Sequence, residues 1–554
     1  MNNTETKHCQ NCKNQFTIEP EDFTFYEKIQ VPPPTWCPEC RQQRRMVFRN
    51  FKTFYKRTSD RSLKQVISMY SQKVPYKVYT HDEWWADDWD AKLFGRTVDF
   101  SRPFFEQFHE LLLAVPRFSI MNVQSQDCEY SNFVIGSKNC YLIFGCVDDE
   151  DCVYGHIVWE SKDSLDNLYL YKSELCYECI DCLGSYKLFH CQECESCSES
   201  IGLYDCNSCT NCIGCVGLRQ KSYHVFNEFV GKEGYNKFLT EHPLIAPETI
   251  QLILEKQKEL RRQLPQRHFF GSHNTNVSGN HIYNARNIHH SFDIKGGEDS
   301  KYVYTSRKAI DSYDAAFSPD IELVYEALTT LKCNNTYFSH LCVSCNDVYY
   351  SDNCYNSHNL FGCAGLKSGE YCILNRRYSK EEYELLKEKI IEHMKKTGEW
   401  GQFFPIKLSP FCYNESIANE YMPLAKEQAL AKGFRWNDEM PSTVGQETIS
   451  NDALPKNPDD FSEELTEHIL KCDKCGRNYR LILKEIAFYK QMKLSLPRNC
   501  FNCRHQRRMN MRNSRRLWPG ICTKCDKNIE TSYSPEQQKE FKIYCDQCYK
   551  SEMV

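Results

Sequence analysis

Long hydrophobic runs are absent from this sequence. The longest apolar stretch, around residues 111–115, is far too short to cross a bilayer. The start, MNNTETKHCQ, also lacks the charged and then apolar pattern of a secretion signal. We therefore expect a cytoplasmic protein without membrane contact, in which most cysteines stay reduced as thiols or act as metal ligands.

Common catalytic motifs are missing as well. The sequence has no P-loop, no GxGxxG after a strand and no GxSxG elbow. We therefore identify no small-molecule substrate and expect a protein that is not an enzyme.

Charge is unevenly distributed, although the formal net charge is only -5. Residues 471–554 contain 19 Lys and Arg against 8 Asp and Glu, and residues 1–62 contain 11 against 7. The segment between them, 63–470, therefore has a net charge of -20. Basic ends on an acidic middle suit an anionic partner, or docking of the ends on the middle itself.

Cysteine, in contrast, is abundant, with 33 residues in 554. Twelve of them form three sets of paired CxxC motifs near the chain ends. Two residues between cysteines let a tight turn aim both sulfurs at one ion, and a second turn completes a four-thiolate shell without an open position. Redox-active CxxC pairs are the alternative. We predict three structural Zn²⁺ sites, with the ligands Cys9, Cys12, Cys37, Cys40; Cys472, Cys475, Cys500, Cys503; and Cys522, Cys525, Cys545, Cys548.

The first two cysteine sets lie in related segments. Residues 9–50 and 472–513 are identical at 14 of 42 positions without a gap, including Phe25/Phe488, Tyr26/Tyr489 and Pro34/Pro497. Both resemble a small bacterial zinc-ribbon family with CxxC, an aromatic pair, a proline, and CxxC-R before basic residues. The third set resembles other short zinc ribbons more loosely. The resemblance implies zinc binding, and it leaves function open because ribbons either bind nucleic acid or brace a fold.

An arginine-rich tail follows each of the first two sets, as RQQRRMVFRN (41–50) and RHQRRMNMRN (504–513). Guanidinium groups match phosphate oxygens, and interleaved aromatic residues can stack on exposed bases. The alternatives are docking on the acidic middle of the chain or on a protein, or a plain solvated surface. The candidate nucleic-acid ligands are Arg41, Arg44, Arg45, Arg49, Arg504, Arg507, Arg508, Arg512, Arg515 and Arg516.

The middle of the chain contains a short repeat. Residues 176–220 read as three copies of a 15-residue unit, C-x2-C-x2-C-x8, and small residues continue the columns backward to Ser131. A second run matches the first at a constant offset of 148, as in Gly214/Gly362 and Asn227/Asn375. A short fixed period predicts a β-solenoid in which each coil contacts its neighbours.

The cysteines of this repeat allow three interpretations: packed thiols, ligands of an extra metal or Fe–S cluster, or disulfides. The columns of Cys209 and Cys212 become Ser357 and Leu360 in the second run. A metal shell would not tolerate leucine, whereas a column of packed small residues would. We therefore favour packed thiols.

The expected architecture is multidomain and mainly β: zinc ribbons at both ends flanking a duplicated 15-residue-repeat β-solenoid with helical caps. The expected segments are 1–62, zinc ribbon with basic tail; 63–121, α-rich Trp-containing connector; 122–230, solenoid block 1; 231–270, helical cap and linker; 271–378, solenoid block 2; 379–440, helical cap; 441–465, linker; 466–516, zinc ribbon with basic tail; and 517–554, zinc ribbon.

The favoured function is a non-enzymatic zinc-binding scaffold that contacts nucleic acid, RNA or DNA, or a ribonucleoprotein through its arginine-rich ends. The alternative is a protein-interaction scaffold without nucleic acid. Two further hypotheses are less favoured. One is a metal or redox role of the cysteine ladder. The other is a carbohydrate-active enzyme using Asp163 with Asp166, or Asp311 with Asp314.

Overall fold

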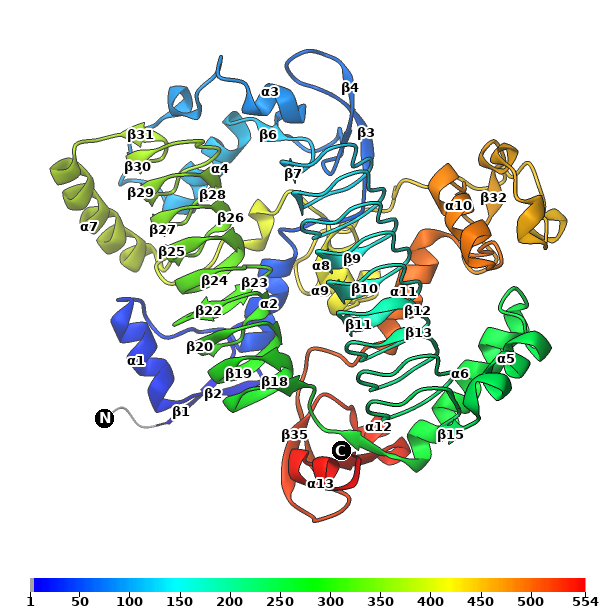
Figure 1. Ribbon diagram of the computed structural model, residues 1–554. Helices are drawn as coiled ribbons and strands as arrows, with labels where there is room; N and C mark the ends of the chain where they lie inside the picture. The colour runs from blue at the N-terminus through cyan, green and yellow to red at the C-terminus, as the bar shows by residue number, and fades with distance from the viewer. Residues whose placement is uncertain (1–3, 554) are drawn as a thin grey trace.

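Two parallel β-ladders lie side by side at the centre of the molecule, and the cysteine-rich ends pack around them (Figure 1). The computed structural model describes residues 4–553. Within that range the chain forms many strands and 13 α-helices. None of these helices is both long and apolar enough for a membrane span.

Block 1 (residues 122–230) is a ladder whose segments pair in parallel at a constant 12-residue offset, as in Leu168↔Ile180 and Leu170↔Cys182. The same offset continues through the isolated bridges, from Gln126↔Lys138 to Ile213↔Val225. Its strands are β7 (Asn122–Val123), β8 (Val134–Ile135), β9 (His156–Trp159), β10 (Leu168–Tyr171), β11 (Ile180–Leu183), β12 (Tyr186–Phe189), β13 (Ser198–Ile201), β14 (His224–Val225) and β15 (Glu228–Phe229).

The predicted 15-residue repeat is therefore wrong, because the structure has a 12-residue spatial repeat. Every third residue points inward, and both 12 and 15 are multiples of three, so cysteines at either spacing fall on inward positions. One residue in three has a positive φ, for example Tyr154, Ile157 and Glu160. Its amide donates to a carbonyl of the preceding repeat, as from Ile157 to Phe144, so the bent backbone keeps its hydrogen bonds.

Hydrogen bonding explains why serine and cysteine share the inward positions. The hydroxyl of Ser164 donates to the carbonyl of Lys162 and accepts from the amide of Cys176. The thiol of Cys197 does the same with Glu195 and Cys209. The inward thiols of block 1 form a buried core, so these cysteines are packed thiols that also satisfy backbone groups.

Block 2 (residues 271–378) forms one 15-stranded sheet with the same 12-residue offset over most of its length, as in Tyr313↔Tyr325. Its strands are β17 (Gly271–Ser272), β18 (Thr275–Tyr283), β19 (Ala285–Ile294), β20 (Gly297–Lys301), β21 (Tyr304–Ser306), β22 (Ala309–Ile310), β23 (Tyr313–Ala316), β24 (Ile321–Leu331), β25 (Cys333–Tyr337), β26 (His340–Val343), β27 (Asn346–Tyr349), β28 (Asp352–Tyr355), β29 (His358–Phe361), β30 (Glu370–Ile373) and β31 (Arg376–Arg377).

Matched asparagines end the two ladders. The side chain of Asn227 accepts from the amide of Val216 and donates to its carbonyl, and Asn375 makes the same pair of bonds with Ala364. Helices follow both asparagines in the chain, so no further strand is added to the edge of either ladder. They are α5 (Gly231–Glu241) and α6 (Pro247–Gln263) after block 1, and α7 (Lys380–Thr397) after block 2.

The first cysteine unit (residues 4–62) packs on block 2, and the connector after it joins both blocks. In the connector, Trp84 is fully buried and its ring lies 5.5 Å from that of Tyr355 in block 2. The elements are β1 (Glu5–His8), β2 (Gln15–Ile18), α1 (Pro20–Lys28), α2 (Pro38–Met46), β3 (Tyr55–Thr58), β4 (Gln65–Ser68), β5 (Val78–Tyr79), α3 (His81–Trp85), α4 (Phe104–Ala114) and β6 (Arg117–Phe118).

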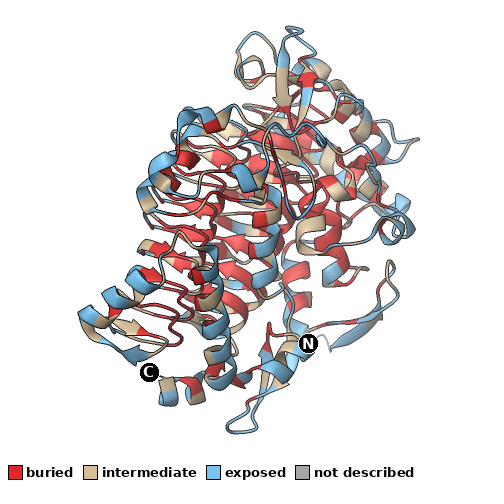
Figure 2. Ribbon diagram, turned by 90° about the vertical axis from the view of Figure 1, so that its right-hand side faces the viewer, coloured by how far each residue is buried: buried red, intermediate tan, exposed pale blue. Residues whose placement is uncertain are grey.

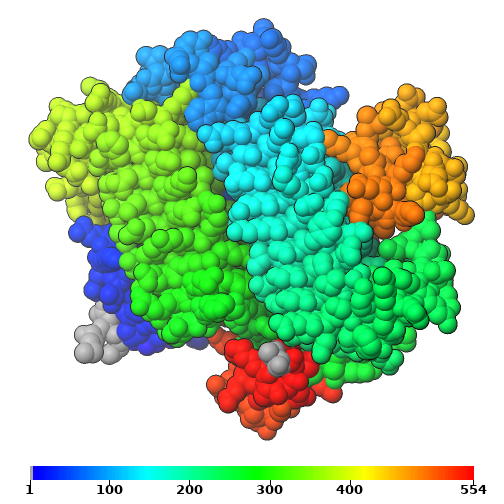
Figure 3. Space-filling view, viewed as in Figure 1, coloured from blue at the N-terminus to red at the C-terminus, as the bar shows by residue number. Residues whose placement is uncertain are grey.

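The second (residues 466–516) and third (residues 517–553) cysteine units follow a short helical segment and an exposed linker. Burial is concentrated in the ladders and in the helices that face them (Figure 2), and the ladders meet along a continuous seam (Figure 3). The elements are α8 (Ile417–Tyr421), α9 (Lys426–Ala431), β32 (Leu470–Lys471), β33 (Asn478–Tyr479), α10 (Leu483–Met492), α11 (Phe501–Met511), β34 (Trp518–Ile521), β35 (Asn528–Thr531), α12 (Pro535–Glu540), β36 (Lys542–Tyr544) and α13 (Asp546–Met553).

Candidate metal centres and the arginine interface

The structure brings the twelve predicted cysteines together as three tetrads that could hold metal ions. In each tetrad the four sulfur atoms lie within 4.8 Å of one another. The distances are 3.7 Å from Cys12 to Cys37, and 3.8 Å both from Cys475 to Cys500 and from Cys525 to Cys545. A tetrahedral ion with metal–sulfur bonds of about 2.3 Å places its sulfurs about 3.8 Å apart, so the spacing fits a four-thiolate shell.

Backbone amides in the tetrads favour the thiolate form that a metal needs. The amide of Cys545 donates to the sulfur of Cys522 at 3.3 Å. Burial raises the pKa of Cys522, but this amide and those of Lys524 and Cys525 outweigh it and lower the pKa to about 6. Cys37 donates likewise to Cys9 at 3.2 Å.

The first arginine tail lies on block 2, where it forms a buried ion-pair network. Arg45 contacts Asp314 at 3.0 Å and Glu326 at 2.5 Å. Arg41 contacts Asp314 at 2.7 Å, and Arg44 contacts Glu326 at 2.8 Å. All five side chains are at most 5% exposed, so the ion pairs are shielded from water and salt.

The second arginine tail repeats this network on block 1. Arg508 contacts Asp166 at 2.8 Å and Glu178 at 2.9 Å, and Arg504 contacts Asp166 at 2.8 Å. Arg507 contacts Glu178 at 2.6 Å. Burial raises the pKa of Glu178, but the guanidinium groups of Arg508 and Arg507 lower it to about 2.

The two networks are related residue by residue. The arginines match at the offset of 463 that relates the cysteine units, and the acids match at the offset of 148 that relates the blocks. The first unit therefore docks on the second block, and the second unit docks on the first block. Aromatic contacts follow the same rule, since Tyr26 packs on Tyr325 and Tyr489 on Tyr177.

Most of the ten arginines predicted for nucleic acid are buried in the fold. Eight of their side chains are at most 6% exposed, namely Arg41, Arg44, Arg45, Arg49, Arg504, Arg508, Arg512 and Arg515. Only Arg507 and Arg516 are half exposed or more. Sequence reasoning did not identify the acidic partners of the buried arginines. The 12-residue spacing of Asp166 and Glu178 nevertheless recurs in Asp314 and Glu326.

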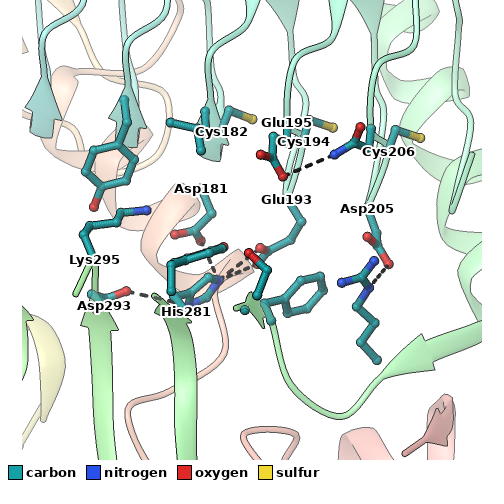
Figure 4. A pocket seen from close by; sticks show the side chains of 18 of the residues that line it. Asp181, Cys182, Glu193, Cys194, Glu195, Asp205, Cys206, His281, Asp293 and Lys295 are labelled. Atoms are coloured by element: carbon teal, nitrogen blue, oxygen red, sulfur yellow. Dashed lines mark hydrogen bonds and ion pairs between the residues drawn. The ribbon is translucent and has the colours of Figure 1, made fainter. Parts of the chain in front are cut away.

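A polar pocket lies between the blocks (Figure 4), and the end of the second tail pairs with two acids of its wall. We call this site the polar pocket. It has a volume of about 80 Å³ and is lined by Asp181, Glu193, His281, Asp293 and Lys295, among others. Arg512 contacts Asp181 at 2.7 Å and also pairs with Asp293. Burial lowers the pKa of His281, but Asp181 and Glu193 outweigh it, so the pKa is raised.

Two further groups offer metal ligands within 4.8 Å of one another: Asp181, Glu193 and His281 in the polar pocket, and a second set formed by the buried His156 and His505 with the partly buried Glu420. Each has a cation in place already. Arg512 lies on Asp181, and the ammonium of Lys52 lies 3.2 Å from Glu420. Because these cations oppose a metal ion, both groups fit ion pairing better than metal binding.

We expect His156 to make folding stability depend on pH. Burial, aided by the nearby His505, Lys52 and Arg515, holds the pKa of His156 well below its usual value, although Glu420 opposes this shift. The unfolded state, with a histidine pKa near 6.5, therefore binds a proton first, and stability falls as pH drops below that value. Between pH 7.5 and 5.5, His156 accounts for a loss of about 1.4 kcal/mol in the free energy of unfolding.

Urea unfolding of the wild type and of His156→Gln at both pH values measures this share. The variant should lose about 1.4 kcal/mol less than the wild type over the same interval. Equal losses in the two proteins would show that folding does not lower the pKa of His156.

Comparisons of the chain with models of known protein families and with curated proteins found no match.

Proposed function

We propose that the protein is a non-enzymatic zinc scaffold, in which three zinc ribbons hold two β-solenoid blocks in a fixed, crossed arrangement. The observation that supports this most is the matched pair of buried arginine networks. A duplicated ribbon has kept three arginines, and a duplicated block has kept an aspartate and a glutamate, at positions that meet in space. Such retention of both partners fits a docking role.

Zinc is the metal that best suits these tetrads. Four thiolates with sulfurs about 3.8 Å apart are typical of structural zinc, and each unit is too small to bury a sufficient core alone. The third unit also has a docking function: β36 pairs in parallel with β16 (Pro265–Arg267) in the segment between the blocks. The hydroxyl of Tyr549 donates to Asp205 of block 1 at 2.5 Å.

Nucleic-acid binding and glycoside hydrolysis, the two competing functions, would each require the buried ion pairs between arginines and acids to break. Nucleic-acid binding through the arginine tails would need eight buried guanidinium groups to leave their partners in the fold. Glycoside hydrolysis would need free acids, whereas Asp166 and Asp314 are fully buried against arginines. The exposed faces of the blocks and helical caps remain available to a protein partner, which favours the protein-interaction form of the scaffold.

Binding of a labelled 20-nucleotide single-stranded RNA and of a DNA duplex, followed by fluorescence anisotropy between 50 and 300 mM NaCl, tests the proposal. We expect a Kd above about 1 µM for both probes at 150 mM NaCl, because non-specific binding is that weak at this salt concentration. Tighter, steeply salt-dependent binding that is weakened by Arg507→Glu or Arg516→Glu would overturn it in favour of a nucleic-acid-binding function.

Elemental analysis should give three zinc ions per chain.

A further inference from the structure

A second hollow lies between the blocks, and it is apolar. It has a volume of about 60 Å³, and its wall comes from both ladders. The residues at its rim, including Ile135, Val147, Leu331 and Val343, are partly exposed, so the hollow opens to solvent. One charged side chain, that of Arg49 from the first arginine tail, lines it, and Arg49 is only 4% exposed.

This apolar pocket is the internal counterpart of the polar pocket. Arg49 corresponds to Arg512, which pairs with two acids of the polar pocket, at the offset of 463, and eight of the lining residues have a counterpart in the polar pocket at the offset of 148. Asp181 and Asp293, which pair with Arg512, become Thr329 and Gly145 around Arg49. Four further exchanges replace polar or charged residues by apolar ones: His281 by Phe133, Tyr283 by Ile135, Lys295 by Val147 and Glu195 by Val343.

The exchange leaves Arg49 without an anion. Among residues 4–553 its guanidinium makes one hydrogen bond, from Nη1 to the hydroxyl of Thr329, and its Nε has no partner. The rings of Phe133, Phe51 and Phe317 surround it, with centres 3.9, 4.4 and 4.7 Å from Cζ. Burial lowers the pKa of Arg49 to about 9, so the group is still a cation at neutral pH.

We propose that this pocket binds a small carboxylate with a short apolar body, which supplies the anion that Asp181 and Asp293 supply to Arg512. An unpaired buried charge is unfavourable, and a carboxylate matches the planar fork of a guanidinium with two hydrogen bonds. The apolar wall suits a short alkyl chain. A phosphate ester would leave its remaining charge against phenylalanine and valine, so the chemistry selects a monoanion.

Titration of the full-length, zinc-loaded protein with sodium butyrate, by calorimetry and by thermal unfolding, tests this site. Two matched probes serve as controls. n-Butanol has the apolar body without the charge, and sodium chloride has an anion without the apolar body. We expect butyrate alone to bind and to raise the unfolding temperature. No binding of butyrate, or equal effects of butanol or chloride, would overturn the proposal.

Thr329→Asp is the decisive variant because it restores the acid of the polar pocket. Thr329 has φ 59°, and its counterpart Asp181 has φ 52°, so aspartate fits the same backbone. Gly145→Asp is unsuitable, since a Cβ there would lie 2.6 Å from Ile157 Cδ1. We expect Thr329→Asp to keep its zinc, to unfold at the wild-type temperature or above, and to bind butyrate at least about tenfold more weakly, as an internal ion pair replaces the ligand. Unchanged butyrate affinity in Thr329→Asp would overturn the assignment.

Discussion

Replacing Cys500 by serine is expected to reduce the bound zinc from three ions to two per chain and to release the second cysteine unit from block 1. The unit has too small a core to stay folded without metal, and structural zinc contributes about 10–16 kcal/mol to such units. Helix α11 begins at Phe501, directly after this ligand, and carries Arg504, Arg507 and Arg508 to block 1. Loss of the metal therefore withdraws the whole arginine network.

Elemental analysis and hydrogen exchange measure this effect. Exchange should increase in α11 and around Asp166 and Glu178, whereas the first unit on block 2 should remain protected. Cys128→Ser is a matched control, because Cys128 lies at an inward ladder position, where serine also occurs, and outside every tetrad. Three zinc ions in Cys500→Ser, or unchanged exchange in α11, would contradict the structural role of this metal.

Arg45→Met is expected to destabilise the protein by about 3–5 kcal/mol, the cost of removing one partner from a buried ion-pair network. Arg45 is fully buried and contacts both Asp314 and Glu326, so the two carboxylates would keep only Arg41 and Arg44. The Arg508→Met substitution on block 1 should have an effect of the same size, because Arg508 contacts Asp166 and Glu178 in the same way. Urea unfolding measures both.

A double-mutant cycle separates the ion pairs from lost packing. Arg45→Met combined with Glu326→Gln should destabilise less than the sum of the single changes, by about 0.5–3 kcal/mol, because neighbouring members of one network are not additive. Arg516→Met is the exposed control and should stay within about 0.5 kcal/mol of the wild type. Additive effects of Arg45 and Glu326 would argue against a docking network at this site.

The tetrads could be anticipated from sequence because their spacing is local. Two residues between cysteines fix the turn whatever surrounds it, and the structure brings each predicted set together. The ladders show where such reasoning fails. The C-x2-C-x2-C spacing agrees with the inward positions at every third residue that the structure shows, but the length of a repeat depends on which segments pair. The cysteines of block 1 follow a 15-residue spacing, whereas its strands pair at a 12-residue offset.

The arginine partners could not be found from local sequence. Arg45 and Glu326 lie 281 residues apart, so no window of sequence contains both. The duplications did hold a usable signal, because the arginines repeat at one offset and Asp166, Glu178, Asp314 and Glu326 at the other. The apolar pocket was invisible for the same reason, since its wall and its one charge come from three separate segments.

The crossed docking has a consequence for synthesis on the ribosome. The first cysteine unit leaves the exit tunnel early, but its docking surface around Glu326 follows 281 residues after Arg45. At about 5–20 residues per second, this unit waits roughly 14–56 s with its arginines unpaired. The second unit finds block 1 already made. A neighbouring nascent chain could capture the waiting unit, so exchanged dimers are the misassembly that this chain order invites.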